Sequence, residues 1–435
     1  MILLDKGENM KNKLNQVTKS LNGFTKKIES KLLSLVNLKK LIKKKKSKKI
    51  FGLLEVSILI MLTMTFSLAM GGFLSFRFIA KENKATISTE MNEFIKNYNY
   101  IKDNYYMDVK DNTMLDAAIK GLLESLQDPY STYIENTSNF TLYLDGSFIG
   151  VGVQINNTDD GISIIKVFDD SPAKVKGLKV NDIIISVNGE DFTDQPASAV
   201  PTYVKNHAGP FTIKVLRDGV EKVFTMEKAL VIIPSVSHKL YNRGTEKIGY
   251  IKVEIFSETT YSQFKSALDD LKKQGMTSLI IDVRDNSGGH LSAVADMASL
   301  FLKNDKIIYK TQAKDITKDI YSTGRSNADY PIVFLANNAS ASASELFIAA
   351  LKDNLGAKVF GTVTYGKGTI QELHNLSENT SYKITIKKWL TPNGTWIHGT
   401  GIAPDYHVLP NDAYNSNPIE ANDNQLHDAI NNLIK

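Results

Sequence analysis

Hydrophobic positions after residue 85 follow two different periods, and the changes between them mark separate regions. Between residues 91 and 126 apolar residues recur every three or four positions, which predicts amphipathic helices. From about residue 145 short runs alternate apolar and polar residues between Asp-Gly and Asn-Gly turns, a pattern typical of β-strands. From residue 247 strand-like and helical stretches alternate as far as about residue 375, which predicts an α/β core.

The helical N-terminal region, residues 85–140, is predicted to contain two helices, at 91–105 and 114–126. Each helix carries its apolar residues along one face. Such a face packs most often against the helix's own domain, but it also makes these helices candidates for a homodimer contact. Pro129 ends the helical pattern.

In the α/β region the pattern indicates βαβ units. Strands are predicted at residues 248–254, 277–284, 330–337 and 357–363, and helices at 262–275, at 291–303 and from about 342 onward. Further strands follow from about residue 369. A strand, a helix and a second strand in this order predict parallel pairing with the helix on one face of the sheet.

A run of 21 residues without a charge, 56–76, is long enough to span a bilayer. The 50 residues at the start of the chain contain 15 lysines and a net charge of +12, so the total of +5 leaves −7 on the rest. The positive-inside rule predicts a cytoplasmic N-terminus and an extracytoplasmic chain from about residue 80. A cleavable secretory signal is the alternative, but its apolar core is usually about 7–15 residues long. The sequence therefore favours an uncleaved anchor at 51–79.

The local basic segment also changes how the overall charge is interpreted. Because the remaining chain is acidic, the overall sequence pI of 8.8 does not indicate a nucleic-acid partner. The chain has no cysteine, which excludes thiol catalysis and thiolate metal sites. The seven histidines form no metal-binding pattern, so we expect no metal and no cofactor.

The stretch "SPAKVKGLKVNDIIISVNG", residues 171–189, carries a short predicted helix. Ser171 is a plausible N-cap, Pro172 suits the first helical position and Gly177 suits the C-terminal stop. With its flanking strands the stretch resembles a PDZ domain of the bacterial protease type, over roughly residues 140–230.

The resemblance implies that this domain binds extended peptide C-termini by adding a strand to a sheet edge. By position, the loop "FIGVGV" would line the groove, through Ile149, Gly150, Val151 and Gly152. The alternative is that these residues form a glycine-rich strand start inside the domain core.

The stretch "NASASASELF", residues 338–347, places three serines on alternate positions. Ser342 and Glu345 fit a capping box, so a helix is predicted to begin here. A serine at a helix N-terminus also faces the positive end of the helix dipole and free N–H donors.

Two nearby motifs match other enzyme classes only in part. "DNSGGH", residues 285–290, resembles the serine motif of trypsin-like proteases, but the α/β pattern and the upstream histidines do not fit that class. "GTVTYGKGT", residues 361–369, resembles a phosphate-binding loop. It lacks the serine or threonine that binds magnesium, and a strand pattern follows it where a helix is required.

Lys367 lies between Gly366 and Gly368, which allow other backbone segments to approach closely. A crowded, poorly solvated pocket would lower the pKa of the lysine and leave a neutral amine able to take a proton from a serine. On a strand, Gln371 would share the face of Lys367 and could hold the amine by a hydrogen bond. The alternative is a solvated lysine in a glycine-rich hairpin.

The motifs "VRDNSGGH", "NNASASASELFIAALKDN", "FGTVTYGKGTIQ" and "TPNGTWIHGTGIAPD", in this order behind a PDZ domain, resemble the carboxyl-terminal processing peptidases, or tail-specific proteases. The resemblance covers about residues 95–410 and implies a serine–lysine endopeptidase. It implies that Ser342 is the nucleophile and Lys367 the base, with Gln371 beside it. It also implies an oxyanion hole formed by the N–H groups of Gly288 and Ala343.

Two positions remain open within this resemblance. Ser287 replaces a proline that is often found in the loop, and the neighbouring Gly288 makes the change tolerable. Asp353 could be an auxiliary acid, but its place three helical turns after Ser342 favours a local cap or pair, so it stands outside the predicted dyad.

The predicted fold class is a mixed α/β protease core with a mostly β PDZ domain and an N-terminal transmembrane helix. The segments are a basic cytoplasmic segment (1–50), an anchor (51–79), a helical region (85–140), a PDZ domain (141–230), a peptidase core (231–410) and a tail with one helix (411–435). After residue 410 we expect no appended cell-wall-binding domain.

The predicted function is that of a membrane-anchored serine endopeptidase of the cell membrane, with its catalytic domain outside the cytoplasm. Its expected partners are protein or peptide substrates with free C-termini. The alternative is a membrane-tethered PDZ scaffold with an inactive protease domain.

Overall fold

The computed structural model describes residues 63, 88–135, 137–377 and 380–434. The chain divides into two units, residues 1–108 and 109–435. Within the described part of the chain, no helix combines the length and apolar character needed to cross a membrane. The predicted anchor, residues 51–79, lies outside the described residues except at Thr63.

Both helices predicted near the start of the described chain are present. In the first unit, α3 (Thr89–Asn104) begins after Ser88, whose hydroxyl accepts a hydrogen bond from the Met91 N–H at 3.2 Å. No residue of α3 is buried. In the second unit, α4 (Asp111–Ser125) buries Leu123.

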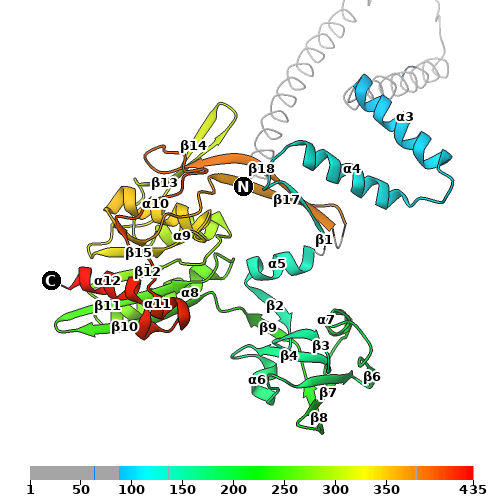
Figure 1. The fold of residues 1–435 in the computed structure, drawn as a ribbon, viewed down its shortest axis with the longest axis horizontal. Helices are drawn as coiled ribbons and strands as arrows, with labels where there is room; N and C mark the ends of the chain where they lie inside the picture. The colour runs from blue at the N-terminus through cyan, green and yellow to red at the C-terminus, as the bar shows by residue number, and fades with distance from the viewer. Residues whose placement is uncertain (1–62, 64–87, 136, 378–379, 435) are drawn as a thin grey trace, which may run out of the picture. The chain divides into compact units, whose positions relative to one another are not determined.

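The PDZ region forms an antiparallel sheet in the order β3-β4-β5-β7-β8, with β6 paired to β5. Its elements, seen in Figure 1, are β3 (Val153–Thr158), β4 (Gly161–Val167), α6 (Pro172–Lys176), β5 (Ile183–Val187), β6 (Glu190–Asp191), α7 (Ala199–Asn206), β7 (Phe211–Arg217) and β8 (Val220–Met226). Helix α6 has the predicted bounds, because Ser171 caps it and Gly177 ends it at φ 88°.

A short ribbon connects the PDZ sheet to the rest of the second unit. Strand β2 (Ser147–Gly150) follows α5 (Thr137–Asp145) and pairs antiparallel with β9 (Ala229–Ile232). The Glu258 N–H donates to the Leu144 carbonyl at 2.9 Å, so helix α5 contacts the loop before α8.

The predicted α/β core is confirmed. A six-stranded sheet has the order β10-β11-β12-β15-β16-β19, antiparallel between β10 and β11 and parallel elsewhere. Its strands are β10 (Val236–Arg243), β11 (Glu246–Val253), β12 (Ser278–Asp282), β15 (Ile332–Ala336), β16 (Lys358–Gly361) and β19 (Tyr406–His407).

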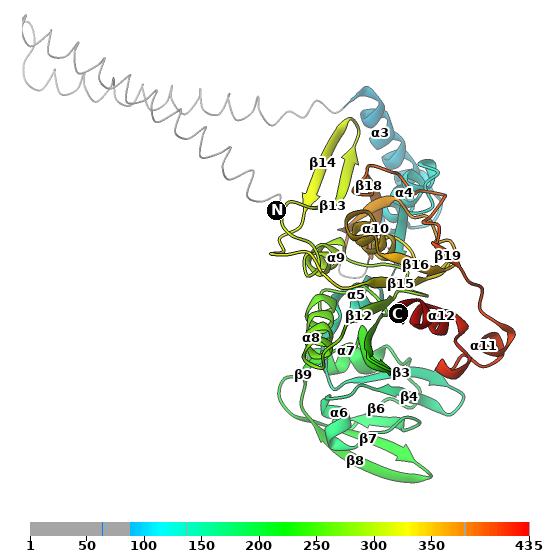
Figure 2. The ribbon, with the colours of Figure 1, turned by 90° about the vertical axis from the view of Figure 1, so that its left-hand side faces the viewer.

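Helices cover both faces of this sheet (Figure 2). Alternate residues of β15 point to opposite faces, so Phe334 joins one buried cluster and Leu335 another. The first cluster packs against α8 (Thr260–Lys273), α9 (Leu291–Ala298) and α10 (Ala343–Leu355), and the second packs against the C-terminal helix α12 (Asn424–Leu433).

A second sheet, in the order β1-β18-β13-β14 with β17 paired to β18, is antiparallel. Its strands are β1 (Thr132–Glu135), β13 (Ile307–Ala313), β14 (Ile316–Tyr321), β17 (Thr369–Asn375) and β18 (Thr380–Leu390). Strand β1 comes from the region expected to be helical, residues 85–140. The PDZ sequence is thus inserted between β1 and the rest of the peptidase core.

The tail contains more structure than the single helix expected. Besides α12 it forms α11 (Asp412–Ser416) and a 3₁₀ turn, η1 (Glu420–Asn422). A buried ion cluster fastens it to the core, because the Arg284 guanidinium donates to the carboxylates of Asp282 and Asp423 at 2.6 and 2.7 Å. Sequence periodicity cannot reveal this contact, which joins residues 139 positions apart.

Candidate active site

The turn between β15 and α10 holds Ser342 in a strained backbone conformation. Its φ and ψ angles are 54° and −109°, in a region that residues other than glycine rarely occupy. Such a conformation costs roughly 1–3 kcal/mol and is found mostly at functional sites. The helix is confirmed where it was predicted, with Ala343 as its first residue.

The serines at 340, 342 and 344 differ in their hydrogen bonds: two of the hydroxyl groups donate to main-chain carbonyls, and the third does not. The Ser340 hydroxyl donates to the Val283 carbonyl at 2.7 Å, and the Ser344 hydroxyl donates to the Asn286 carbonyl at 2.8 Å. Among the described residues no acceptor takes a hydrogen bond from the Ser342 hydroxyl. Its proton is therefore free to be removed by a base, and the residue is 9% exposed.

Lys367 lies in the loop between β16 and β17, and its two glycine neighbours are closely approached by other chain segments, as predicted. A Cβ atom on Gly366 would lie 2.8 Å from the Gly401 nitrogen. One on Gly368 would lie 2.7 Å from Nε1 of Trp396. The Lys367 carbonyl accepts a hydrogen bond from the Trp389 indole at 2.8 Å, which fixes the backbone of the loop.

Glu345 joins the serine turn to the lysine loop. Its carboxylate is fully buried and accepts hydrogen bonds from the N–H groups of Ser342 and Lys367, both at 2.8 Å. It also accepts from the Gly366 N–H and the Thr364 hydroxyl, both at 2.6 Å. One carboxylate therefore positions the backbone of both predicted catalytic residues.

The surroundings of Lys367 favour its neutral form. Burial lowers the pKa of the ammonium group below its ordinary value, and the charge of Lys383 lowers it further. The carboxylates of Asp128 and Glu345 act in the opposite direction but do not reverse the shift. This direction agrees with the one that the crowded glycine loop predicts.

Gln371 lies in β17, two residues beyond Thr369. Its Nε2 group donates to the hydroxyls of Thr369 and Thr385 at 2.9 and 3.1 Å. These bonds fix the orientation of the amide and leave its carbonyl oxygen as the group that could accept from the Lys367 amine. The role of Gln371 as a partner of the lysine stays a prediction.

Gly288 lies directly against the serine turn. A Cβ atom there would lie 3.0 Å from Ser342 Cβ and 3.1 Å from the Ala343 nitrogen, so only glycine fits at φ 110°. The Gly288 N–H donates to Oδ1 of the buried Asn286 at 2.9 Å. Its use as an oxyanion donor, like that of Ala343, stays a prediction and requires that this N–H be shared with or released from Asn286.

The four residues predicted to line the PDZ groove have different environments. Ile149 is 72% exposed, whereas Val151 belongs to the buried core of the PDZ region. The Val151 carbonyl accepts from the Ala173 N–H at 2.7 Å, and a Cβ atom on Gly152 would meet the Ser171 side chain. The contact of Gly150 and its neighbours with a peptide stays a prediction.

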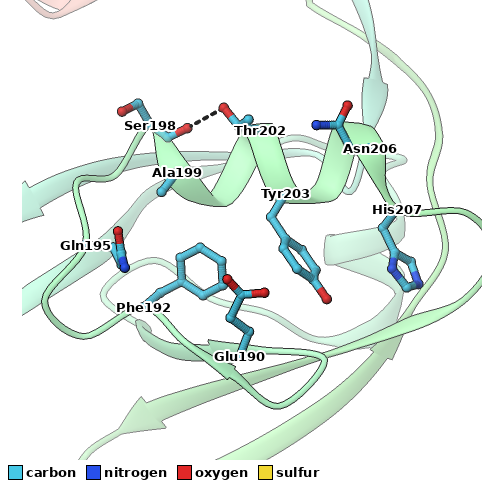
Figure 3. A pocket seen from close by; sticks show the side chains of 9 residues that line it. All are labelled: Glu190, Phe192, Gln195, Ser198, Ala199, Thr202, Tyr203, Asn206 and His207. Carbon is cyan, nitrogen blue, oxygen red and sulfur yellow. Dashed lines mark hydrogen bonds between the residues drawn. The ribbon is translucent and has the colours of Figure 1, made fainter.

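A pocket of about 530 Å³ lies on the PDZ region beside α7 (Figure 3). None of the four predicted groove residues lines it. Its wall consists of Glu190, Phe192, Gln195, Ser198, Ala199, Thr202, Tyr203, Asn206 and His207. The pocket is therefore separate from both the Ser342 turn and the 149–152 segment.

Sequence reasoning missed three residues near Ser342 and Lys367. Tyr130 lies beneath Lys367, whose Nζ is 5.1 Å from the ring centroid, and Asp128 holds the same turn. Asn286 fixes the loop next to Ser342. In the sequence, Pro129 between Asp128 and Tyr130 indicates only the end of a helix, and no local pattern points to their place beside Lys367.

Comparison with known proteins gives three matches along the chain. Residues 247–408 match the model of peptidase family S41, and residues 140–216 match that of the PDZ domain. Residues 76–138 match the N-terminal domain of the activating protease CtpB. The order of these matches agrees with the order of the regions in the fold.

Two curated relatives come from Bacillus subtilis (strain 168). The carboxy-terminal processing protease CtpB is 34% identical over 76% of this chain and 70% of its own length. The carboxy-terminal processing protease CtpA is 31% identical over 76% of this chain and 73% of its own length. The chain belongs to peptidase family S41. It is a serine-type peptidase of the carboxy-terminal processing kind with a PDZ domain, so the family resemblance noted in the sequence is confirmed.

Among solved structures, a photosystem II D1 C-terminal processing protease is similar to this S41 peptidase. It has 21% sequence identity and a TM-score of 0.44, with 75% of this chain and 95% of that chain covered. At this score the similarity carries no argument about the site.

The structure also shows the environment of Asp353, whose role the sequence left open. Its side chain is exposed, and Oδ2 accepts from the Asn393 N–H at 3.1 Å. This contact joins residues 40 positions apart, so it links α10 to the segment after β18 and is not the local cap or pair that the sequence favoured.

Proposed function

We propose that this S41 peptidase cleaves peptide bonds with Ser342 as nucleophile and Lys367 as general base. One observation carries the proposal: the buried Glu345 carboxylate accepts hydrogen bonds from the backbone N–H groups of both residues. The strained Ser342 turn, its free hydroxyl proton and the lowered pKa of Lys367 support the same assignment.

The neutral Lys367 amine takes the Ser342 proton as Oγ attacks the substrate carbonyl carbon. The resulting tetrahedral oxyanion accepts hydrogen bonds from the N–H groups of Ala343 and Gly288. Losing one such donor typically lowers the rate by roughly 100- to 1,000-fold. The ammonium of Lys367 then protonates the leaving amine, and an acyl-enzyme remains.

Water resolves the acyl-enzyme, with Lys367 again accepting a proton. Throughout these steps the carbonyl oxygen of Gln371 holds the amine, since the Nε2 group of Gln371 is engaged by Thr369 and Thr385. Substrate C-termini bind to the PDZ domain along the 149–152 segment, and the preceding chain reaches Ser342.

The protein is further proposed to be anchored in the cell membrane through residues 51–79, with a cytoplasmic N-terminus and an extracytoplasmic catalytic domain. The support is the 21-residue uncharged run next to the lysine-rich segment. Deleting residues 1–79 should release the peptidase from the membrane fraction. Recovery of the shortened protein in that fraction would contradict the anchor.

A homodimer through the N-terminal helices is part of the same proposal. In α3 and at its C-cap several apolar side chains are about half exposed, which supports a contact with a partner surface. They are Met91, Phe94, Ile95, Ile101 and Tyr105.

The test of the catalytic assignment compares wild type with Ser342→Ala and Lys367→Ala. Each substitution should abolish cleavage of an unfolded protein substrate, while thermal unfolding of the variant stays close to that of wild type. Ser344→Ala is the matched control, because its hydroxyl donates to a main-chain carbonyl and it should retain cleavage. Full activity in either dyad variant refutes the assignment.

The alternative of an inactive scaffold predicts peptide binding without turnover. It is not favoured, because the chain belongs to a peptidase family and the structure positions both Ser342 and Lys367 with one carboxylate. If the purified wild-type protein bound peptide but did not cleave it, the scaffold alternative would be favoured again.

A further inference from the structure

Two charged residues that interact electrostatically with Lys367 have no role in the proposed mechanism. Asp128 lies in the turn between α4 and β1, and Lys383 lies in β18. The two elements are far apart in the sequence but adjacent in the second sheet, because β1 pairs with β18.

Strand register places Lys383 on the face of the sheet that carries Gln371. Gln371 pairs with Thr385, and Lys383 precedes Thr385 by two residues. Paired residues of antiparallel strands point to the same face, and so do alternate residues of one strand. Lys383 therefore projects from the same face as Gln371 and Thr369, and Thr369 begins β17 two residues after Lys367.

Hydrogen bonds fasten the Asp128 turn to the same strand. The Asp128 carboxylate accepts from the Tyr130 N–H at 3.1 Å and from the Ser131 hydroxyl at 2.6 Å. The Ser131 oxygen in turn accepts from the Thr385 N–H at 3.0 Å. The turn is thus held two residues from Lys383.

Tyr130 brings this turn into contact with the base. The Lys367 Nζ lies 5.1 Å from the centre of the Tyr130 ring, a cation–π distance that favours the ammonium form. Asp128, fixed by the same turn, adds a negative charge near the amine. Lys383 adds a positive charge from β18.

We propose that Asp128 and Lys383 act as an opposed pair of charges that sets the pH range in which Lys367 can serve as the base. Both are positioning residues that act through Lys367, and neither is a catalytic residue. The inference rests on the proposed function, since it assumes that Lys367 must be neutral to accept the Ser342 proton.

The sign of each contribution follows from electrostatics. Burial lowers the pKa of Lys367, Lys383 lowers it further, and Asp128 raises it. Burial also lowers the pKa of Lys383, whereas Asp128 raises it. Removing Lys383 should therefore raise the pKa of Lys367, and neutralising Asp128 should lower it.

Other charged or titratable groups also lie around Lys367, and each has interaction partners of its own. From α10, the Glu345 carboxylate is held by its four donors. Tyr365 of the lysine loop interacts with Tyr130, whose pKa is raised to about 12 mainly by burial. His398 accepts from the Gly368 N–H at 3.3 Å, and its charge when protonated lowers the pKa of Asp128.

The test measures kcat/KM for peptide cleavage against pH in the full-length protein. Lys383→Met should move the acid limb of the profile to higher pH, because Lys367 then becomes neutral only at higher pH. Asp128→Asn should move it to lower pH. At a fixed pH on the limb, activity should fall several-fold in the first variant and rise several-fold in the second, with similar maximal rates.

Lys387→Met is the matched control, because this lysine lies in the same strand, carries the same charge and is exposed. Its profile should follow that of wild type. Lys383→Gln replaces Lys383→Met if the latter unfolds at a lower temperature than wild type. The inference is overturned if the acid limb does not move in the Lys383 and Asp128 variants, or if it moves in the same direction in both. It is also overturned if the limb of Lys387→Met moves as far as that of Lys383→Met.

The same profiles separate this inference from the proposed function. If Lys367→Ala is inactive while the limbs of the Asp128 and Lys383 variants coincide with wild type, only the charge-pair inference fails. If Lys367→Ala remains active, the proposed function itself fails.

Discussion

Two buried junctions hold the peptidase core together, and they use charge in different ways. At the active site, the carboxylate of Glu345 is surrounded by neutral donors from Ser342, Thr364, Gly366 and Lys367. At the tail, Arg284 binds carboxylates from the core and from the turn before α12. The first junction joins two loops, and the second joins the end of β12 to the turn before α12.

The difference indicates what each junction contributes. Three N–H groups and the Thr364 hydroxyl, all neutral, fix the Glu345 carboxylate in one position without adding a positive charge beside Lys367, which a buried arginine would supply. In the Arg284 cluster every buried charge has an opposite partner. An intact cluster of this kind adds little net stability, but removing one partner is very costly because it leaves a buried charge uncompensated.

The largest expected effect comes from breaking the Arg284 cluster. Arg284→Met leaves the buried carboxylates of Asp282 and Asp423 without their positive partner, and should lower the free energy of unfolding by roughly 3–5 kcal/mol. Denaturant unfolding at neutral pH measures the change, with the exposed Arg243→Met as the control. A loss below about 1 kcal/mol, the usual value of a surface pair, would contradict the account.

A smaller, mainly catalytic effect is expected at the other junction. Glu345→Gln keeps the shape of the side chain but replaces one acceptor oxygen by a donor group that faces donors. A hydrogen bond to a charged group contributes about 1.5–3 kcal/mol, so kcat should fall roughly ten- to a hundredfold as the two loops lose alignment.

The control for this comparison is Glu372→Gln, an exposed glutamate in β17 near the same loop. It should leave kcat unchanged. If Glu345→Gln retained kcat within twofold, the carboxylate would not be what aligns Ser342 with Lys367.

The smallest effect is expected at Asp353, which lies in α10 like Glu345 but makes one exposed contact, to the Asn393 N–H. Asp353→Asn keeps an acceptor oxygen, so the free energy of unfolding should change by less than about 0.5 kcal/mol. Cleavage should also be unchanged. A tenfold loss of kcat with normal stability would place Asp353 in the catalytic machinery.

Local signals predicted most elements of the fold. The Ser171 cap, Pro172 and Gly177 fixed the bounds of α6, and the period-3.6 stripes gave α4 and α8. Strand β1 was missed because its pairing with β18 depends on residues about 250 positions away, which no local period records.

The candidate site likewise contains residues that the local sequence reveals and contacts that only the fold reveals. The residue types of Ser342, Lys367 and Gly288 could be interpreted from their neighbours in sequence and from the family resemblance. The role of Glu345 could be predicted only as a helix cap, since its bonds to Gly366 and Lys367 require the fold. The contact of Tyr130 with Lys367 crosses more than 230 positions and left no sequence pattern.

The most direct test of the central claim is the pH dependence of covalent labelling of Ser342 by a fluorophosphonate, which reacts with activated serines. The account predicts that labelling rises with a single titration whose midpoint lies below the ordinary lysine pKa of about 10.4, and that Lys367→Ala removes it. Labelling that persists unchanged in Lys367→Ala, or that rises only at the ordinary lysine pKa, would contradict the account.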